Sequence, residues 1–377
     1  MDHPNVTVLM TVYNGARYLK SSLQSVLNQT YKNFEFLIIN DGSSDDSLKI
    51  IESFRDPRIQ VHTNPANLGQ TKSLNLGLRL ASGRWIARMD ADDLAFPRWL
   101  ERQVNFISVN FHYAVVSSQA VVISSEGKIR KTLKTPSPMT DILLRCLTAS
   151  PINHVGCLMQ KSIILEVGGY DEDFRIAADY SLWSKLLRKG YQLTTLPELS
   201  VAIRFHDASQ SNLEKGQRDA QEMSKIMLGN IEGLTTVKMD LAQVLSIWKT
   251  IYDCGPMSDE EFRQGQEFLK SLYPNLRSEW DIPLSCRQKF LQRQLLTVNM
   301  KRAFALIGRR EILRLRELAR QYMACHGPAN AFLGIYLLSF LGVPSVQLLP
   351  GIYERILELS TRKKLIRVPY PAFVHGR

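Results

Sequence analysis

Residues 6–15 read VTVLMTVYNG, and residues 34–44 read FEFLIINDGSS. Each stretch is a largely apolar run that ends in a polar turn, which is typical of a strand buried on both faces. Residues 18–29 lie between the two runs, and Leu19 and Leu23 begin an apolar face at helical spacing. A strand, a helix and a second strand in this order predict a βαβ unit of a parallel sheet.

The alternation continues along the first half of the chain, with helices and strands expected at 47–54, 59–62, 74–81 and 84–89. This pattern predicts a doubly wound α/β fold with a mixed, mainly parallel sheet. Beyond about residue 212 the pattern is helical only and rich in Gln, Leu, Lys and Arg. We therefore expect a domain over residues 1–212 and an all-helical C-terminal region over residues 213–377.

Polar clusters follow three of the expected strands, at Tyr13–Asn14, Asp41–Gly42 and Asp90–Asp93. Ligands of such sheets bind beyond the carboxyl ends of the strands. The three clusters should therefore converge on one crevice.

The sequence Asp90-Ala91-Asp92-Asp93 contains the clearest chemical signal of the three clusters. Alternate residues can place Asp90 and Asp92 on the same side of the crevice, where two carboxylates suit Mg²⁺ or Mn²⁺ and a shared substrate phosphate. The alternative is a polar turn that caps the next helix. The position at a strand end, beside two other polar strand tips, favours the metal site.

Asp41 and Lys72 are weaker candidates. The Asp41 carboxylate can accept a hydrogen bond from a base N–H or a ribose hydroxyl, or it can form an Asx-turn ahead of a helix. Lys72 follows Asn67 in a segment that leads into a helix, where it can reach a phosphate or remain an exposed side chain.

Together the motifs resemble the family 2 glycosyltransferases of the GT-A fold, over about residues 4–212, and in particular the branch that builds bacterial surface polysaccharides. The ordered series is VTVLMTVYNG, IINDGSSDDS, NLGQTKSLNLGL, GRWIARMDADD, PRWLERQ, NHVGCLMQKSIILEVGGYDEDF, AADYSLWSKLLRKGY and RFHDASQS. The resemblance implies an inverting transfer of a sugar from a nucleotide-diphosphate donor, usually UDP-linked, to a hydroxyl of a glycan or lipid-linked acceptor.

The resemblance also implies roles for individual residues. Asp179 matches the catalytic base. The donor nucleotide would contact Thr11, Tyr13, Asn14, Asp41, Asn67, Lys72 and Asp90. A divalent cation, Mn²⁺ or Mg²⁺, would bind Asp92 and Asp90, with His206 as a further candidate. Acceptor or lid contacts would come from Asp93, His154, Arg204 and His206.

The chain departs from the family pattern at two positions that bear on these roles. Leu74 stands where many members have an Arg that touches the nucleotide, so Lys72 would supply that charge. Ala178 stands where a Glu often precedes the catalytic Asp, which removes a second acid but leaves Asp179 in place.

Composition places the chain among globular proteins, with 377 residues, 45% apolar and 22% charged. Five cysteines without a CxxC pair argue against a disulfide framework or a structural zinc site. The N-terminus has no basic segment or cleavage site typical of a secretory signal. We therefore expect a cytoplasmic protein.

The net charge of +11 is concentrated in residues 301–377, which hold 13 Lys/Arg and 4 Asp/Glu. Residues 301–320 predict a basic amphipathic helix, and 331–343 form an apolar run that is shorter than the ~20 residues a membrane span needs. One interpretation is a peripheral position on the inner face of the plasma membrane, helped by the basic cluster 362–364. The other is a buried helix with a solvated basic face.

Three other functions fit the sequence less well than sugar transfer. A sugar nucleotidyltransferase normally has a Gly-rich GxGxR loop after the first strand, where this chain has residues 13–17, YNGAR. A non-catalytic nucleotide-sugar-binding relative is disfavoured by the intact acidic residues. A dinucleotide-dependent oxidoreductase would have GxGxxG after that strand. No nucleic acid partner is expected.

Overall fold

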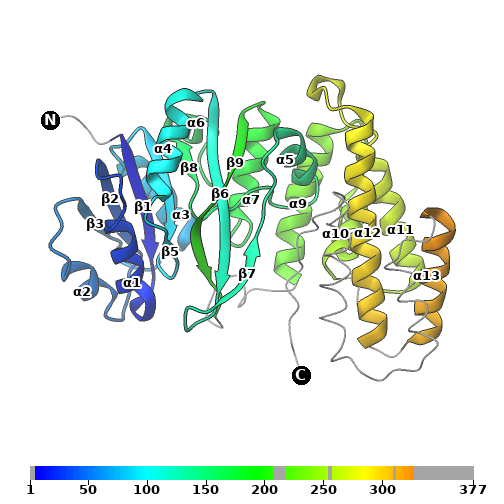
Figure 1. The fold of residues 1–377 in the computed structure, drawn as a ribbon, viewed down its shortest axis with the longest axis horizontal. Helices are drawn as coiled ribbons and strands as arrows, with labels where there is room; N and C mark the ends of the chain where they lie inside the picture. The colour runs from blue at the N-terminus through cyan, green and yellow to red at the C-terminus, as the bar shows by residue number, and fades with distance from the viewer. Residues whose placement is uncertain (1–4, 207–216, 254–256, 309–310, 327–377) are drawn as a thin grey trace. The chain divides into compact units, whose positions relative to one another are not determined.

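The computed structural model describes residues 5–206, 217–253, 257–308 and 311–326 (Figure 1). The chain divides into two compact units after Leu234. The first unit contains the sheet, and the described part of the second is built from helices.

The sheet of the first unit has nine strands in the order β3-β2-β1-β4-β8-β6-β9-β5, and β7 pairs with β6 (Figure 1). Neighbouring strands from β3 to β4 are parallel, as are β6 and β9, whereas β8, β5 and β7 pair antiparallel with their neighbours. The predicted α/β class with a mixed sheet is therefore confirmed. The strands are β1 Val6–Val12, β2 Phe34–Asn40, β3 Ile59–Thr63, β4 Trp85–Asp90, β5 Leu94–Ala95, β6 Tyr113–Ile123, β7 Ile129–Leu133, β8 Leu158–Gln160 and β9 Gln192–Arg204.

Helices cover both faces of the sheet. The apolar face predicted around Leu19 and Leu23 lies on α1 (Ala16–Leu27) and joins one core with Val8 and Met10 of β1. On the opposite face α3 (Gln70–Leu80) lies so close to β1 that a Cβ at Gly77 would meet Leu9 Cδ1 at 2.3 Å. The other helices of this unit are α2 Ser47–Glu52, α4 Trp99–Val109, α5 Met139–Cys146, α6 Lys161–Glu166, α7 Ala178–Arg188 and α9 Gln217–Leu234.

The parallel pairing brings the polar strand tips together as the sequence predicts. Thr11 of β1 lies in register with Asp90 of β4, and Val12 lies in register with Asn40 of β2. The clusters at Tyr13, Asp41 and Asp90 therefore leave the sheet at the same edge.

The boundary expected at residue 212 falls in 207–216, outside the described residues, and the structure divides the chain later. The helix α9 belongs to the first unit because its side chains bond to that unit. Asn230 donates to Cys146 O at 2.8 Å and to Ser184 Oγ at 2.9 Å, and Glu222 accepts from backbone amides that precede α7. The first unit thus extends 22 residues beyond the expected end.

The second unit begins with two helices whose N-termini are closed by capping boxes, Asp240 with Gln243 and Ser258 with Glu261. The helix expected over 301–320 is wrong as a single element, because these residues belong to the end of α12 and the start of α13. The elements are α10 Leu241–Tyr252, α11 Asp259–Leu272, η1 Ser278–Trp280, α12 Leu284–Gly308 and α13 Ile312–His326.

The segments 331–343 and 362–364 that suggested membrane contact lie outside the described residues. Within the residues that are described, no helix combines the length and the apolar character needed to cross a bilayer.

Candidate active site

The carboxylate of Asp90, the last residue of β4, forms an ion pair with the buried side chain of Arg88. Arg88 Nη2 lies 2.5 Å from Asp90 Oδ1, and the Arg88 side chain is 0% exposed. Gln70 Nε2, from the first turn of α3, donates to the same oxygen at 3.2 Å. A charge-assisted bond of this kind is shorter and stronger than a neutral one, so the Asp90 carboxylate is held in one orientation.

Asp92 lies two residues after Asp90 and contacts His206, two residues beyond the end of β9. His206 Nε2 is 2.9 Å from Asp92 Oδ2. Burial and the neighbouring charge of Asp90 raise the pKa of Asp92, and the His206 contact opposes that rise. Of the three candidate metal ligands, the structure therefore brings His206 into contact with Asp92 and places Asp90 near enough for its charge to act on Asp92.

Asp93 is turned away from solvent and fastens β4 to β9. Its side chain is buried, and Oδ1 accepts a hydrogen bond from Arg204 N at 2.7 Å. Burial first, and then the charges of Asp92 and Asp90, raise the pKa of Asp93 well above its usual range. Asp93 thus links two strand ends, which differs from the acceptor or lid contact expected for it.

Arg204 and His206 both contact Tyr18 of α1, and Arg204 also donates to backbone oxygens just after β4 and β6. Arg204 Nε donates to Asp92 O at 2.9 Å, and Nη1 donates to Ser124 O and Ser125 O at 3.3 and 3.2 Å. The Arg204 guanidinium lies 4.5 Å from the centre of the Tyr18 ring, and the His206 ring lies 5.0 Å from it. The ends of β4, β6 and β9 are therefore tied into one cluster beside the acidic residues.

Asp41, at the end of β2, is buried and holds the segment that leads into α3. Oδ1 accepts from Asn64 Nδ2 at 2.7 Å and from Leu68 N at 2.9 Å, and Oδ2 accepts from Gly69 N at 2.9 Å. Asn67 is exposed and also accepts from Gly69 N, at 3.0 Å. These contacts reach residues 64–69 and are not the local Asx-turn that the sequence offered as the alternative, and Ser43 N donates to Asn40 Oδ1 instead. Three of the four lone-pair positions of Asp41 are nevertheless used within the protein.

We expect Asp41→Asn to lower the free energy of unfolding by about 1–3 kcal/mol, because the amide group would face backbone N–H donors that the carboxylate now satisfies. Chemical denaturation monitored by tryptophan fluorescence measures this change. Asp46→Asn is the matched control, since Asp46 is exposed on the same turn. Equal stability of the two variants would contradict the structural role of Asp41.

Thr11, Tyr13 and Asn14 line the end of β1 in three different environments. Thr11 is 8% exposed, whereas Tyr13 is 53% exposed and presents its ring to solvent. Asn14 has a left-handed backbone, with φ of 50°, and its Oδ1 accepts from Ser44 N at 2.9 Å. Asn14 therefore joins the turn after β1 to the turn after β2, and the neighbouring Tyr13 side chain is exposed.

Lys72 is exposed on the first turn of α3, and within the described residues its side chain forms no hydrogen bond or ion pair. On that turn it is Gln70 that reaches the acidic residues. The structure thus leaves the Lys72 ammonium group unengaged, without linking it to Asp90 or Asp92.

Asp179 lies in the first turn of α7 and accepts a hydrogen bond from Ser150 Oγ at 3.1 Å. Burial raises the pKa of Asp179, and the charge of Asp90 adds to the rise, while hydrogen bonds from Tyr180 N and Ser150 oppose it. The Asp179 carboxylate is therefore near enough to the end of β4 for the charge of Asp90 to act on it.

His154 belongs to the packing behind the acidic residues. Its Nε2 lies 2.7 Å from the Tyr170 hydroxyl oxygen, and its ring meets Trp183 edge-on with centroids 5.9 Å apart. Burial and the charge of Arg88 hold the pKa of His154 well below its usual range, which favours the neutral imidazole. The contacts of His154 described here are packing contacts, and its contact with an acceptor stays a prediction.

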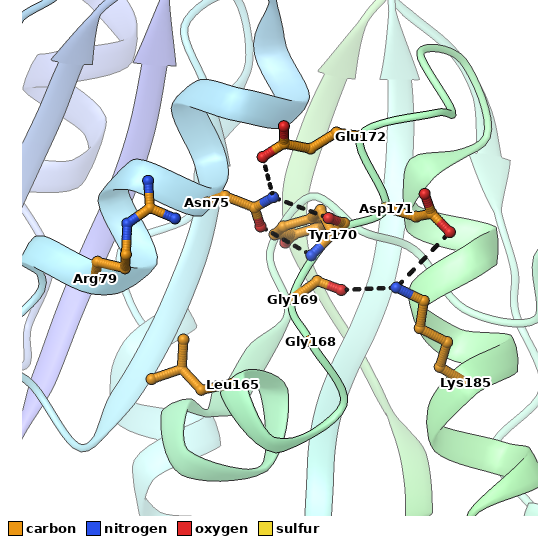
Figure 2. A pocket seen from close by; sticks show the side chains of 9 residues that line it. All are labelled: Asn75, Arg79, Leu165, Gly168, Gly169, Tyr170, Asp171, Glu172 and Lys185. Atoms are coloured by element: carbon orange, nitrogen blue, oxygen red, sulfur yellow. Dashed lines mark hydrogen bonds and ion pairs between the residues drawn. The ribbon is translucent and has the colours of Figure 1, made fainter.

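A cavity of about 500 Å³ lies beside α3, and it contains none of the predicted site residues (Figure 2). Asn75 and Arg79 border it from α3, and Lys185 borders it from α7. The remaining lining residues are Leu165, Gly168, Gly169, Tyr170, Asp171 and Glu172. The cavity thus lies against the loop that precedes α7 rather than at the strand ends.

Sequence reasoning did not identify several residues that contact the predicted ones, among them Arg88, Gln70 and Ser150. Arg88 had a visible signal, because a charged residue within the apolar run RWIARM needs a buried partner. Gln70 and Ser150 come from other segments of the sequence, and no local pattern marks them.

Relatives found by sequence point to one family. Residues 7–168 match the family described as "Glycosyl transferase family 2". An uncharacterized glycosyltransferase of Haemophilus influenzae is 33% identical over 256 residues, which covers 65% of this chain and 79% of the relative. The putative glycosyltransferase EpsE of Bacillus subtilis is 34% identical over 207 residues, which covers 53% of this chain and 73% of EpsE.

Solved structures agree on the fold. TarS residues 1–349 of S. aureus, in complex with UDP-GlcNAc, matches with a TM-score of 0.54 at 17% identity, covering 81% of this chain and 92% of that one. The mannosyltransferase PcManGT of Pyrobaculum calidifontis, in complex with GDP-Man and Mn²⁺, matches with a TM-score of 0.50 at 16% identity, covering 80% and 88%. Both are glycosyltransferases of the GT-A type, so the fold predicted from the sequence is confirmed.

Proposed function

This chain belongs to glycosyl transferase family 2, and we propose that it moves a sugar from a UDP-linked donor to a hydroxyl of a glycan or lipid-linked acceptor, with inversion at the anomeric carbon. The observation that supports the proposal best is the position of Asp90 and Asp92 at the end of β4, beside the end of β1, with Asp179 on the first turn of α7 near enough for the charge of Asp90 to act on it. A leaving diphosphate needs carboxylates that hold a metal ion, and an incoming hydroxyl needs a base. The reaction therefore requires both kinds of group in one crevice. The nucleotide sugars bound to TarS and to PcManGT support the donor class.

The donor nucleotide would lie across the ends of β1 and β2. The exposed Tyr13 ring would stack on the base, with Thr11 beside it, and the remaining lone pair of Asp41 would accept from a ring N–H. Asn14 and Asn67 shape the two turns that border this surface. Lys72 would add positive charge toward the diphosphate, and Asp90 would accept from a ribose hydroxyl.

The residues at the end of β4 fit a divalent cation, Mn²⁺ or Mg²⁺. Asp90 is close enough to Asp92 for its charge to raise the cost of ionising Asp92, and a cation would relieve that repulsion. The described residues contain no group of three or more His, Cys, Asp or Glu side chains arranged to hold a metal ion. Donor phosphates and water would therefore complete the shell around Asp92, as is usual for Mg²⁺. When bound, the ion acts as a Lewis acid on the diphosphate.

Asp179 would accept the proton of the acceptor hydroxyl as that oxygen attacks the anomeric carbon and the nucleoside diphosphate leaves. Its raised pKa suits this role, because a base whose pKa approaches the working pH takes a proton more readily. A single displacement of this kind inverts the anomeric configuration. Arg204 and His206 would close the crevice over the donor from the end of β9.

The basic C-terminal region supports a cytoplasmic enzyme that meets a lipid-linked acceptor at an anionic membrane surface. This part of the proposal rests on the sequence of 301–377 alone.

A donor screen tests the proposal. Purified full-length chain is incubated with UDP-, GDP- and dTDP-sugars, with Mn²⁺ or with EDTA, and nucleotide release is measured. We expect release from UDP-sugars in Mn²⁺, and a loss of at least about 100-fold in EDTA, because Lewis-acid stabilisation is worth several kcal/mol. Release that EDTA leaves unchanged would contradict the metal site. A chain that binds a UDP-sugar but turns over no donor would instead be a non-catalytic relative.

A further inference from the structure

The loop of residues 170–177 leads directly into the helix that carries Asp179, and α3 holds one side of this loop. Asn75 accepts from Tyr170 N at 2.9 Å and donates to Tyr170 O at 2.8 Å and to Glu172 Oε1 at 3.0 Å, as Figure 2 shows. Closer to α7, Thr71 Oγ1 donates to Phe174 O at 3.0 Å. These contacts fix the first half of the loop and leave residues 175–177 to be held by another element.

Glu222 of α9 holds that second half. Its side chain is buried, and Oε2 accepts from Arg175 N at 3.1 Å, from Ile176 N at 2.9 Å and from Ala177 N at 3.1 Å. Oε1 also accepts from Arg175 N, at 3.2 Å. Three consecutive backbone donors thus converge on one carboxylate that lies 45 residues away from Ala177 in the sequence.

The start of α7 needs such a partner. The first N–H groups of a helix have no acceptor within the helix, and a negative charge near them is stabilising. Ala177 is the N-cap residue and makes no side-chain cap, and Ala178 follows it, so neither can supply an oxygen. Within the helix the Asp179 carboxylate accepts from Tyr180 N, whereas the amides that lead into the helix, up to the N-cap Ala177, are held by the carboxylate of α9.

We infer that Glu222 is a positioning residue, which fixes residues 175–177 and thereby the direction in which the first turn of α7 presents Asp179. Ala177 O accepts the first helical hydrogen bond, from Ser181 N at 2.9 Å, so a shift of Ala177 displaces the turn that contains Asp179. The inference rests on the proposed function, because the base role of Asp179 is what makes its position matter. Misplacement of a reacting group by about 1 Å can reduce a rate by about 100-fold.

The test compares Glu222→Ala, Glu222→Gln and, as the matched control on the same helix, Glu232→Gln. Steady-state rates with a UDP-sugar and Mn²⁺ give kcat and the donor KM. We expect Glu222→Ala to lower kcat by about 10- to 100-fold with the donor KM changed less than about threefold, since donor contacts lie on other elements. Glu222→Gln keeps one acceptor oxygen and should recover most of kcat, and Glu232→Gln should match the wild type.

Hydrogen–deuterium exchange of the peptide 174–178 gives a readout that needs no turnover. Faster exchange in Glu222→Ala than in Glu222→Gln is expected. Unchanged exchange would overturn the contact, and faster exchange with an unchanged kcat would overturn the positioning role, as would a rise in donor KM without a fall in kcat. If Glu222→Ala does not fold, the Gln variant decides, with exchange of 174–178 faster than in the wild type and only a small fall in kcat at unchanged donor KM expected, because it loses one of the two acceptor oxygens. An inactive wild-type chain would contradict the proposed function instead, and its exchange data would still decide the contact.

Discussion

Asparagine in place of Asp179 is expected to reduce sugar transfer by about 10²–10⁴-fold while the donor still binds. Asn has the same shape and can still accept from Ser150 Oγ, which now lies 3.1 Å from Asp179 Oδ2. It cannot take up a proton from the acceptor hydroxyl. Initial rates with saturating donor give the loss in kcat, and titration of a UDP-sugar by calorimetry measures binding.

The pH dependence of the wild type provides a second measure of the same residue. Burial raises the pKa of Asp179, so the ionised base is lost as the pH falls through a value above the usual range for Asp. The acidic limb of the kcat/KM profile should therefore lie at a higher pH than an ordinary Asp would give. The residual activity of Asp179→Asn should lack this limb.

Asp173→Asn is the matched control for Asp179→Asn, because Asp173 is an exposed carboxylate of the loop before α7. It should retain wild-type rates and the acidic limb. Turnover by Asp179→Asn within about tenfold of the wild type would refute the base assignment.

The N-terminal half of the sheet could be predicted because its signals are local. The runs at 6–12 and 34–40 are too apolar to lie anywhere but inside, and their strands match those bounds. The order of β1, β2 and β4 then follows from short right-handed connections, so the convergence of Asp41 with Asp90 was also within reach.

The strand β9 was not predicted, although it has 13 residues. Pro197 and Glu198 interrupt its pattern, and its pairing with β6 shifts register beside Ser118 and Gln119. A strand of this kind is stabilised by a partner about 80 residues earlier, and no periodicity within the segment indicates that partner.

The predicted site residues differ in how much of their environment the sequence reveals. Acidic residues at a strand end mark a site, but the cations and amides that orient them are set by packing. The ion pair of Arg88 with Asp90 and the contact of Glu222 with the residues before α7 depend on how the strands and helices pack. The sequence therefore predicts which groups gather at the crevice more reliably than what holds each of them.

Asparagine in place of Asp92 should reduce kcat by about 10²–10³-fold and weaken the response to Mn²⁺. The proposed ion is a Lewis acid worth several kcal/mol, and Asp92 would be its principal protein ligand. His206 Nε2 now lies 2.9 Å from Asp92 Oδ2, but an imidazole carries no negative charge to replace that carboxylate. Rates measured over a range of Mn²⁺ concentrations should show a higher half-saturating concentration as well as a lower maximum.

A comparison of Asp90→Asn with Asp92→Asn distinguishes a residue that binds the metal ion from one that stabilises the fold at the end of β4. Arg88 is fully buried and pairs with Asp90, so an amide at position 90 leaves its charge without a counter-ion and should cost up to about 3 kcal/mol in the free energy of unfolding. Asp92 has no such partner beneath it, and Asp92→Asn should unfold at the wild-type denaturant concentration or above it, because a pKa raised by burial and by Asp90 marks a carboxylate whose charge is unfavourable in the fold. A stable but inactive Asp92→Asn beside a destabilised Asp90→Asn would assign the cation to Asp92. Equal loss of stability in both variants, with Mn²⁺ dependence unchanged, would show that the pair acts as a structural turn at the end of β4.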